Sequence, residues 1–205
     1  MKENIKTEIL ETSRQLFNKH GFASVPMRKI ASECNISVGN LTYHYPHKLD
    51  ILCALMEDIQ PKLEVCDIHS LTSLISYLRQ MIEGIKKNAF FFTISDMQRI
   101  NEECFEINAE TIKKLHQNLI TSLNNLLEDG ILQVQNADNI FEDIVSFWML
   151  SHITWTNEDY QKSVYKQTNL YQFLLQHLTL LSPYMTQSGK DEYKKLKEKL
   201  QNESV

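Results

Sequence analysis

Apolar residues recur at helical spacing along most of the chain. The first stripe lies within residues 3–20 and consists of Ile5, Ile9, Leu16 and Phe17. Lys19 and His20 occupy the last turn, where positive charge suits the helix dipole, and Gly21 supplies a left-handed stop. This pattern predicts a first helix that ends at residue 20.

A second stripe, within residues 27–34, predicts a short helix with Pro26 at its first position. Proline suits that position because its missing N–H would have no helical partner there. Asn35 follows the stripe, and asparagine tolerates the left-handed conformation of a tight turn between two helices. We expect Ile36 to plug this turn and Ser37 to cap the next helix.

The third predicted helix is only about eight residues long, too short to persist by itself. Leu41 and Tyr45, four residues apart, are expected to hold it against the first two helices, and Pro46 ends it. Its outward side chains are small, polar or aromatic. Three helices with a tight turn between the second and the third form a helix-turn-helix, a motif that places its last helix in a DNA groove.

Longer amphipathic helices are expected beyond this motif, and no strand pattern competes with them. A fourth helix begins at residue 47 or 48 and is kinked or ended by Pro61. The run Phe90-Phe91-Phe92 predicts a change of direction, as a buried corner in preference to a flap over a pocket. Further helices are predicted at about 69–88, 102–129, 138–156, 163–182 and 190–201.

Composition agrees with a helical, cytosolic protein. The chain has 205 residues, 42% of them hydrophobic, with only 5 Gly and 4 Pro. Residues 1–50 carry seven Lys/Arg and five Asp/Glu, a balance of +2 within a net charge of −5, so a polyanionic partner is sought there first. The absence of a signal core or an 18-residue apolar run predicts no membrane segment and a cytoplasmic location.

The outward residues of the third helix have distinct expected roles on double-stranded DNA. Val38, Gly39, Asn40 and Thr42 can approach or read base edges, whereas side chains at the end of the helix are better placed for phosphates. The bland alternative is a subdomain that merely packs. The candidate DNA-binding residues are Arg28, Ser37, Val38, Gly39, Asn40, Thr42, Tyr43, His44 and Lys48.

Residues 9–56 resemble the DNA-binding domain of the tetracycline-repressor (TetR) family of bacterial transcriptional regulators. The resemblance is carried by Leu16-Phe17, Gly21-Phe22, Ile30-Ala31, Ile36-Ser37, Gly39-Asn40-Leu41, Tyr43-His44-Tyr45 and Lys48. Two positions depart from the family pattern. Val25 stands where Thr or Ser usually caps the second helix and touches a phosphate, and Asn35 stands where the turn usually has Gly.

The resemblance implies a helical larger domain that dimerises through its last long helices and holds a small-molecule pocket. The expected fold is therefore all-α, with a three-helix helix-turn-helix DNA-binding domain at 1–48. A larger helical ligand-binding and dimerisation domain is expected at 49–205. The implied function is a homodimeric repressor, without a cofactor or metal, that a small apolar or amphipathic effector releases from its operator.

Candidates for the pocket and the dimer interface come from the later helices. An apolar wall with one polar group is typical of ligand pockets, although the same pattern also describes plain core. The pocket candidates are Tyr77, Met81, Phe105, His116, Trp148, His152 and Trp155. The helix at 163–182 is apolar nearly all round, which predicts a second buried face in a two-fold dimer. Its candidate interface residues are Leu174, Leu175, Leu178 and Leu181.

Three rival interpretations remain open at this point. An enzyme is disfavoured because no phosphate loop, nucleophile motif or HExxH motif occurs. A redox sensor needs an exposed cysteine, and only Cys66 is expected near a helix end. A regulator controlled by a protein partner could use the lysine-rich stretch at 190–201, although a solvated charged helix explains that stretch equally well.

Overall fold

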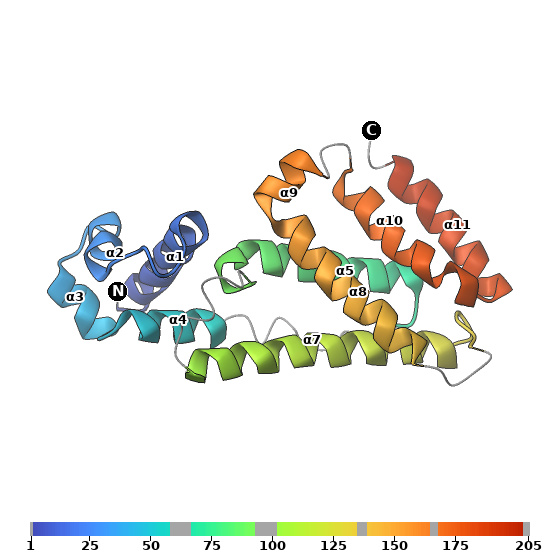
Figure 1. Ribbon diagram of the computed structural model, residues 1–205, viewed down its shortest axis with the longest axis horizontal. Helices are drawn as coiled ribbons and strands as arrows, with labels where there is room; N and C mark the ends of the chain where they lie inside the picture. The colour runs from blue at the N-terminus through green and yellow to red at the C-terminus, as the bar shows by residue number, and fades with distance from the viewer. Residues whose placement is uncertain (1, 58–66, 93–101, 135–138, 165–167, 203–205) are drawn as a thin grey trace. The chain divides into compact units, whose positions relative to one another are not determined.

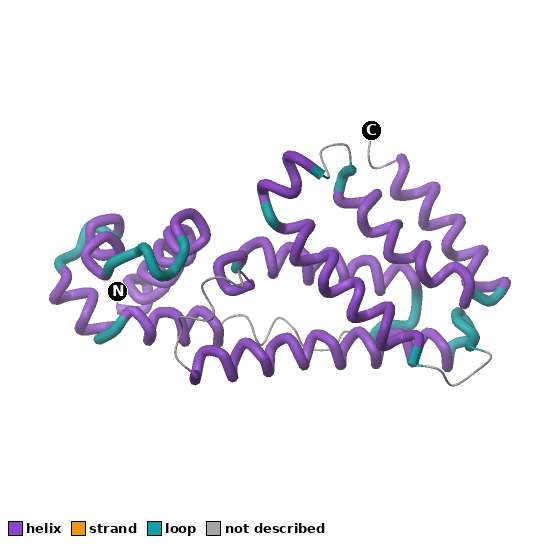
Figure 2. Tube along the Cα trace, in the orientation of Figure 1, coloured by secondary structure: helices purple, strands orange, loops and turns teal. Residues whose placement is uncertain are grey.

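The computed structural model describes residues 2–57, 67–92, 102–134, 139–164 and 168–202. In these ranges the regular structure is helical (Figures 1 and 2), apart from one isolated antiparallel bridge between Leu132 and Met185. The all-α expectation is confirmed. None of the helices described is long and apolar enough to cross a membrane.

Two compact units make up the chain. Unit 1 comprises residues 1–63 with 87–112, and unit 2 comprises residues 64–86 with 113–205. The units are defined by contacts between residues and not by function. The predicted boundary at residue 48 between a DNA-binding domain and a regulatory domain therefore stays a prediction. The Pro61 kink and Cys66 lie outside the described residues.

Unit 1 begins with the predicted helices. They are α1 (Lys2–His20), α2 (Met27–Glu33), α3 (Val38–His44) and α4 (Lys48–Glu57). Gly21 has a φ of 75°, the left-handed stop expected after α1. Pro26 is the N-cap of α2 and not its first helical residue, a shift of one position.

The core of unit 1 explains why a valine stands before α2. Val25 is 2% exposed and packs in the same cluster as the buried side chains of α1 to α4. It stabilises the motif by apolar burial, because it has no hydroxyl to cap a helix.

The short 3₁₀ helix η2 (Ala89–Phe92) packs against α1. The Phe90 ring lies 5.6 Å from that of Phe17, and Asn18 bonds both sides of the bend. Its amide nitrogen donates to the Lys87 carbonyl at 2.8 Å, and its amide oxygen accepts from the Phe90 N–H at 3.0 Å. Phe90 therefore lies in a buried corner, as expected, whereas the side chains of Phe91 and Phe92 lie outside the description.

Unit 2 contains the remaining helices described. They are α5 (Leu71–Lys87), α7 (Glu102–Glu128), α8 (Ile140–Thr156), α9 (Glu158–Ser163), α10 (Leu170–Leu181), η3 (Ser182–Tyr184) and α11 (Gln187–Asn202); α5 and α7 each extend into unit 1 at one end. The long helix predicted at 163–182 is wrong at its start. The helix α10 begins at Leu170, because Asn169 and Gln172 form a capping box that defines its N-terminus.

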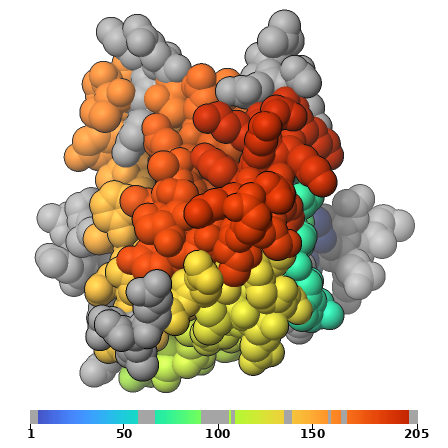
Figure 3. All heavy atoms as spheres, turned by 90° about the vertical axis from the view of Figure 1, so that its right-hand side faces the viewer, coloured from blue at the N-terminus to red at the C-terminus, as the bar shows by residue number. Residues whose placement is uncertain are grey.

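The last helix is docked more closely than its charged sequence predicts. A Cβ at Gly189 would lie 2.3 Å from the Ile131 carbonyl oxygen, so only glycine fits where α11 meets the turn after α7. The Thr186 hydroxyl also donates to the Gly130 carbonyl at 2.7 Å. Figure 3 shows this face of unit 2, with α11 (red) beside α10 (orange) and above the end of α7 (yellow).

Candidate nucleic-acid interface

The turn between α2 and α3 is closed by backbone bonds. Asn35 has a φ of 54°, the one positive value at a non-glycine residue in the part of the chain described. Its N–H donates to the Ser32 carbonyl at 3.1 Å, and the next N–H, of Ile36, donates to the Ala31 carbonyl at 3.0 Å. These two bonds have the pattern that ends a helix with a left-handed residue. The predicted conformation of Asn35 is confirmed.

The helix α3 is held by a cap at its start and by buried residues at its end. The Ser37 hydroxyl accepts a hydrogen bond from the Asn40 N–H at 3.1 Å, which confirms Ser37 as the N-cap. Leu41 is 0% exposed and Tyr45 is 8% exposed, both in the core of unit 1. A seven-residue helix is thereby fixed although it could not persist by itself.

The opposite face of α3 is presented to solvent. Val38 and Tyr43 are 45% and 70% exposed, and Asn40 is also exposed. Thr42 is half-buried, and its hydroxyl donates to the Gly39 carbonyl at 3.2 Å. The Tyr43 ring lies edge-on to that of His44, with centroids 5.2 Å apart. The predicted reading residues therefore share one short surface.

Gly39 lies on this surface with space around it. A Cβ there would meet only the Ser37 hydroxyl oxygen, at 3.9 Å, which is ordinary van der Waals contact. The folded protein therefore does not itself require glycine at this position. A requirement for glycine would have to come from a molecule that approaches α3.

Lys48 has a structural role that the sequence did not reveal. Its ammonium donates to the carbonyls of Phe22 and Ala23, at 2.7 and 3.3 Å, and lies 4.3 Å from the centroid of the Phe22 ring. The start of α4 is thus tied to the turn after α1. A phosphate contact by Lys48 stays a prediction.

A shallow hollow lies beside α2. Its volume is about 610 Å³, and its lining residues are His20, Ser24, Val25, Pro26, Arg28, Lys29 and Ser32. Arg28 is exposed there, whereas the Lys29 ammonium pairs with Glu33 at 2.5 Å and lowers the pKa of that carboxyl group. Apart from Arg28, the polar residues of this hollow were not predicted. Exposed polar side chains scattered over a turn and a helix leave no periodic signal in the sequence.

The predicted pocket residues are only partly brought together. Trp148, His152 and Trp155 share a buried ring cluster on α8, to which Phe173 and His177 of α10 also belong. Those two residues of α10 were missed, although they stand four apart on one stripe.

The other pocket candidates lie elsewhere. Tyr77 and Met81 are buried on α5, and the Tyr77 hydroxyl accepts from the Asn118 amide at 3.3 Å. The side chain of His116 is half-buried and lies 3.2 Å from Glu142, so it pairs there and not with the ring cluster. The side chain of Phe105 lies outside the described residues.

The predicted dimer residues need correction. Leu174, Leu178 and Leu181 are 0% exposed within the single chain, so a partner subunit cannot reach them in this structure. Leu175 is half-buried. The three buried leucines are covered by helices of their own unit, because α10 packs on α8 and on α11, whereas Leu180 remains 40% exposed. An apolar stripe in the sequence cannot distinguish burial within one chain from burial against a partner subunit.

Comparison with known proteins agrees with the geometry of a helix-turn-helix that carries an exposed reading helix. The chain is a DNA-binding transcriptional regulator. The family model of bacterial regulatory proteins of the tetR family matches residues 9–55, and the TetR model of bacterial transcriptional repressors matches residues 52–193. The chain belongs to the TetR family. This is a family of regulators and not of enzymes, in agreement with the sequence-based expectation.

Individual relatives are more distant. The chain is 42% identical over 52 residues to the HTH-type transcriptional regulator YerO of Bacillus subtilis, and 30% identical over 80 residues to UidR of Escherichia coli. These matches cover 25% and 39% of the chain but only 18% and 35% of the relatives.

Solved structures extend the likeness of fold over nearly the whole chain. A TetR-family transcriptional regulator from Marinobacter aquaeolei superposes with a TM-score of 0.79 at 22% identity, covering 95% of this chain and 98% of that one. Salmonella enterica GusR gives 0.64 at 18% identity, with coverage of 89% and 95%.

Proposed function

We propose that this protein is a cytoplasmic, homodimeric repressor that reads an operator with α3 and releases it when a small molecule binds. One observation carries the proposal: α3 turns Val38, Asn40 and Tyr43 outward while Leu41 and Tyr45 anchor it. A helix that exposes large side chains adds little to the stability of the fold. Its surface is explained by a groove into which it fits.

Base reading and backbone contact can be separated by mutation. Asn40→Ala should relax the preference for one base pair by roughly 1–3 kcal/mol, because an asparagine amide can pair with an adenine edge. Arg28→Ala should weaken binding to all sequences alike. It should also lower the slope of log affinity against log salt by about 0.9, the effect of one lost phosphate contact.

Operator fragments for this test are selected from random duplexes with the purified protein. Affinities are then measured by fluorescence anisotropy at several salt concentrations. If Asn40→Ala weakened binding to every duplex equally, the base-reading role of Asn40 would be wrong. If the wild-type protein selected no sequence, the proposed function itself would fail.

The dimer interface is placed on α8 in this proposal. Phe147 and Leu150 are 59% and 67% exposed, stand three residues apart and so share one face of the helix. Exposed apolar side chains side by side indicate a surface that a partner covers. A second copy of the chain fits because a two-fold axis brings the same patch against itself.

Leu150→Glu should therefore convert the dimer to a monomer in sedimentation equilibrium at micromolar concentration. A buried carboxylate at the centre of an apolar interface is strongly disfavoured. Leu127→Glu is the matched control, because Leu127 is a 37% exposed leucine on α7 and lies outside this patch. A wild-type monomer, or an unchanged Leu150→Glu dimer, would contradict the assignment.

A further inference from the structure

A cluster of aromatic rings joins α8 to α10 inside unit 2. The His152 and His177 imidazoles stack with centroids 4.7 Å apart and planes 20° apart. Trp155 stacks on Phe173 at 4.2 Å, and the Trp148 ring lies 5.6 Å from that of His177. All five side chains are buried, so the cluster is enclosed within the domain.

Polar atoms in this cluster have no partner in the described part of the protein. Both ring nitrogens of His152 and the indole N–H of Trp148 are buried without a hydrogen bond, and both side chains are 0% exposed. Buried polar groups are normally paired, because leaving them unpaired is costly. A leucine or phenylalanine at position 152 would fill an apolar core without that cost. The histidine is therefore better explained by a bound group than by packing.

His177, by contrast, has a hydrogen-bond partner at each ring nitrogen. Its Nδ1 lies 2.8 Å from the Phe173 carbonyl oxygen, which can only accept, so Nδ1 carries the proton of the neutral ring and Nε2 is an acceptor. The Ser151 hydroxyl lies 3.0 Å from Nε2 and 2.8 Å from the Trp148 carbonyl oxygen. The Trp148 carbonyl lies within α8 and also accepts a helical N–H bond, so the Ser151 hydroxyl can donate to Nε2, and the unpaired atoms of the cluster are those of His152 and Trp148.

The cluster favours an uncharged ligand. Burial lowers the pKa of His152 well below its ordinary value, with a smaller contribution from His177, and burial lowers the pKa of His177 to about 4. Both rings are then neutral at pH 7 and offer no positive charge to an anion. The remaining ring surfaces are apolar. The matching guest is mainly apolar and carries a group that both donates and accepts.

We propose that the Trp148–His152–His177 cluster binds an uncharged, mainly apolar small molecule through a hydroxyl group. The hydroxyl oxygen accepts from the Trp148 indole N–H, and its proton is donated to a ring nitrogen of His152. This inference rests on the proposed function, since it names the chemical class of the effector. Because the rings are enclosed, the guest enters only when α8 and α10 part locally.

The two tryptophans of the chain make the test direct. Trp148 and Trp155 both belong to the cluster, so intrinsic tryptophan emission reports on this site alone. Three probes of similar shape are titrated at pH 7.5: cyclohexanol, methylcyclohexane and cyclohexanecarboxylate. We expect a saturable emission change and a raised melting temperature with cyclohexanol, weaker binding of methylcyclohexane and no binding of the carboxylate.

Variants locate the interaction at the polar atoms. His152→Phe keeps a ring of similar size but removes both nitrogens. It should weaken the binding of cyclohexanol by about tenfold and leave the binding of methylcyclohexane unchanged. Trp148→Phe should do the same, with Trp155 as the remaining reporter. His116→Gln is the control, because His116 lies outside the cluster and its replacement should alter neither probe. Melting curves establish that each variant is folded.

Several outcomes would overturn the inference. They are no saturable binding of any probe, equal binding of cyclohexanol and methylcyclohexane, tighter binding of the carboxylate, or undiminished cyclohexanol binding by both folded variants. In each case the cluster would be a core without a ligand site, and its buried polar atoms would either bond to enclosed water or stay unpaired. Operator binding and the relaxed base preference of Asn40→Ala are measured without any probe, so the proposed function can stand when this inference fails.

Discussion

Gly39 lies on the exposed face of α3, where an added methyl group would meet only the Ser37 hydroxyl at 3.9 Å. The neighbouring Asn40 and Tyr43 side chains are also exposed. Lys48 illustrates the opposite case, since its ammonium is already engaged by two carbonyl oxygens and a ring. Substitution of Lys48 would therefore alter the fold and any DNA contact together, whereas substitution of Gly39 separates them.

Gly39→Ala should leave the folded state intact and weaken operator binding. Alanine in place of glycine in a helix is worth roughly 0.5–1 kcal/mol of added stability. The methyl group would, however, hold α3 away from the floor of the groove, and we expect at least about a tenfold loss of affinity. Urea unfolding and anisotropy on the same preparation measure the two effects. Unchanged affinity would show that DNA does not approach Gly39 closely.

At the scale of the element, α3 depends on the turn before it. The helix has seven residues, and its entry is set by the left-handed Asn35 and the Ser37 cap. Neither residue is buried, so both act through the backbone and not through packing. The position of the exposed face of α3 is accordingly set by this turn.

Replacing Asn35 tests this dependence. Asn35→Ala should lower the free energy of unfolding by about 1 kcal/mol, because a Cβ-bearing residue without a helpful polar group is strained at positive φ. Asn35→Gly should be close to neutral, since glycine adopts this conformation freely. Urea unfolding of the two variants side by side provides the comparison. An equal loss in both would mean that the Asn35 side chain, and not its backbone conformation, matters.

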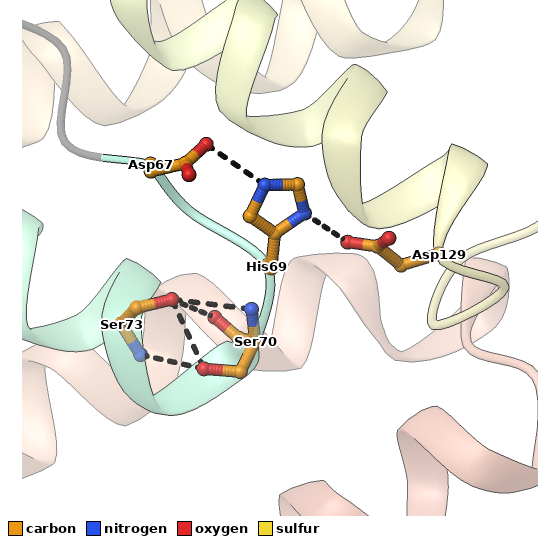
Figure 4. A network of polar contacts seen from close by, with 5 residues as sticks. All are labelled: Asp67, His69, Ser70, Ser73 and Asp129. Atoms are coloured by element: carbon orange, nitrogen blue, oxygen red, sulfur yellow. Dashed lines mark hydrogen bonds and ion pairs between the residues drawn. The ribbon is translucent and has the colours of Figure 1, made fainter.

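At the scale of the whole molecule, two sets of histidines respond to pH with opposite sign. His69 bridges two carboxylates of unit 2, with Nδ1 2.5 Å from Asp129 and Nε2 2.8 Å from Asp67 (Figure 4). The hydrogen bonds that the ring makes to Asp129 and then to Asp67 favour its protonated form and raise the pKa of His69. His152 and His177 are instead buried as neutral rings, and desolvation lowers the pKa of each.

Acidification should therefore destabilise the protein through its buried histidines. A folded-state pKa of about 4 for His177, against 6.5 in the unfolded chain, gives stability that is present above pH 6.5 and lost as the pH falls toward 4. The loss amounts to roughly 3 kcal/mol for this ring. Urea unfolding from pH 7.5 to 4.5 measures it, and His177→Phe should flatten the curve. A wild-type stability independent of pH in this window would contradict the burial of neutral rings.

The contribution of His69 runs the other way. Its raised pKa gives stability that is fully present below pH 6.5 and is lost as the pH rises through the folded-state value. His69→Asn should therefore lose more stability at pH 6 than at pH 9. An equal loss at both values would mean that the two carboxylate bonds do not depend on the charge of the ring. The same urea titration, extended to pH 9, provides the measurement.

Most of unit 1 could be predicted because its signals are local. The stop at Gly21, the turn at Asn35 and the cap at Ser37 each depend on neighbours within a few residues, and each was confirmed. The start of α10 was missed because a capping box of Asn169 and Gln172 is weaker in the sequence than an apolar stripe that continues past it. The tie between Lys48 and the Phe22 turn joins residues 26 apart, and sequence spacing carries no signal for it.

Local sequence patterns therefore specified most of the helices of this protein, the exposed face of α3 and the family resemblance, since capping, turn conformation and amphipathic spacing are short-range effects. The tertiary structure alone decided which apolar faces are core. It buried Leu174 and Leu178 but left Phe147 and Leu150 exposed, and it set His152 against His177 from another helix. The physical reason is that burial depends on which distant helix covers a face, and a stripe along the sequence shows only that the face needs covering.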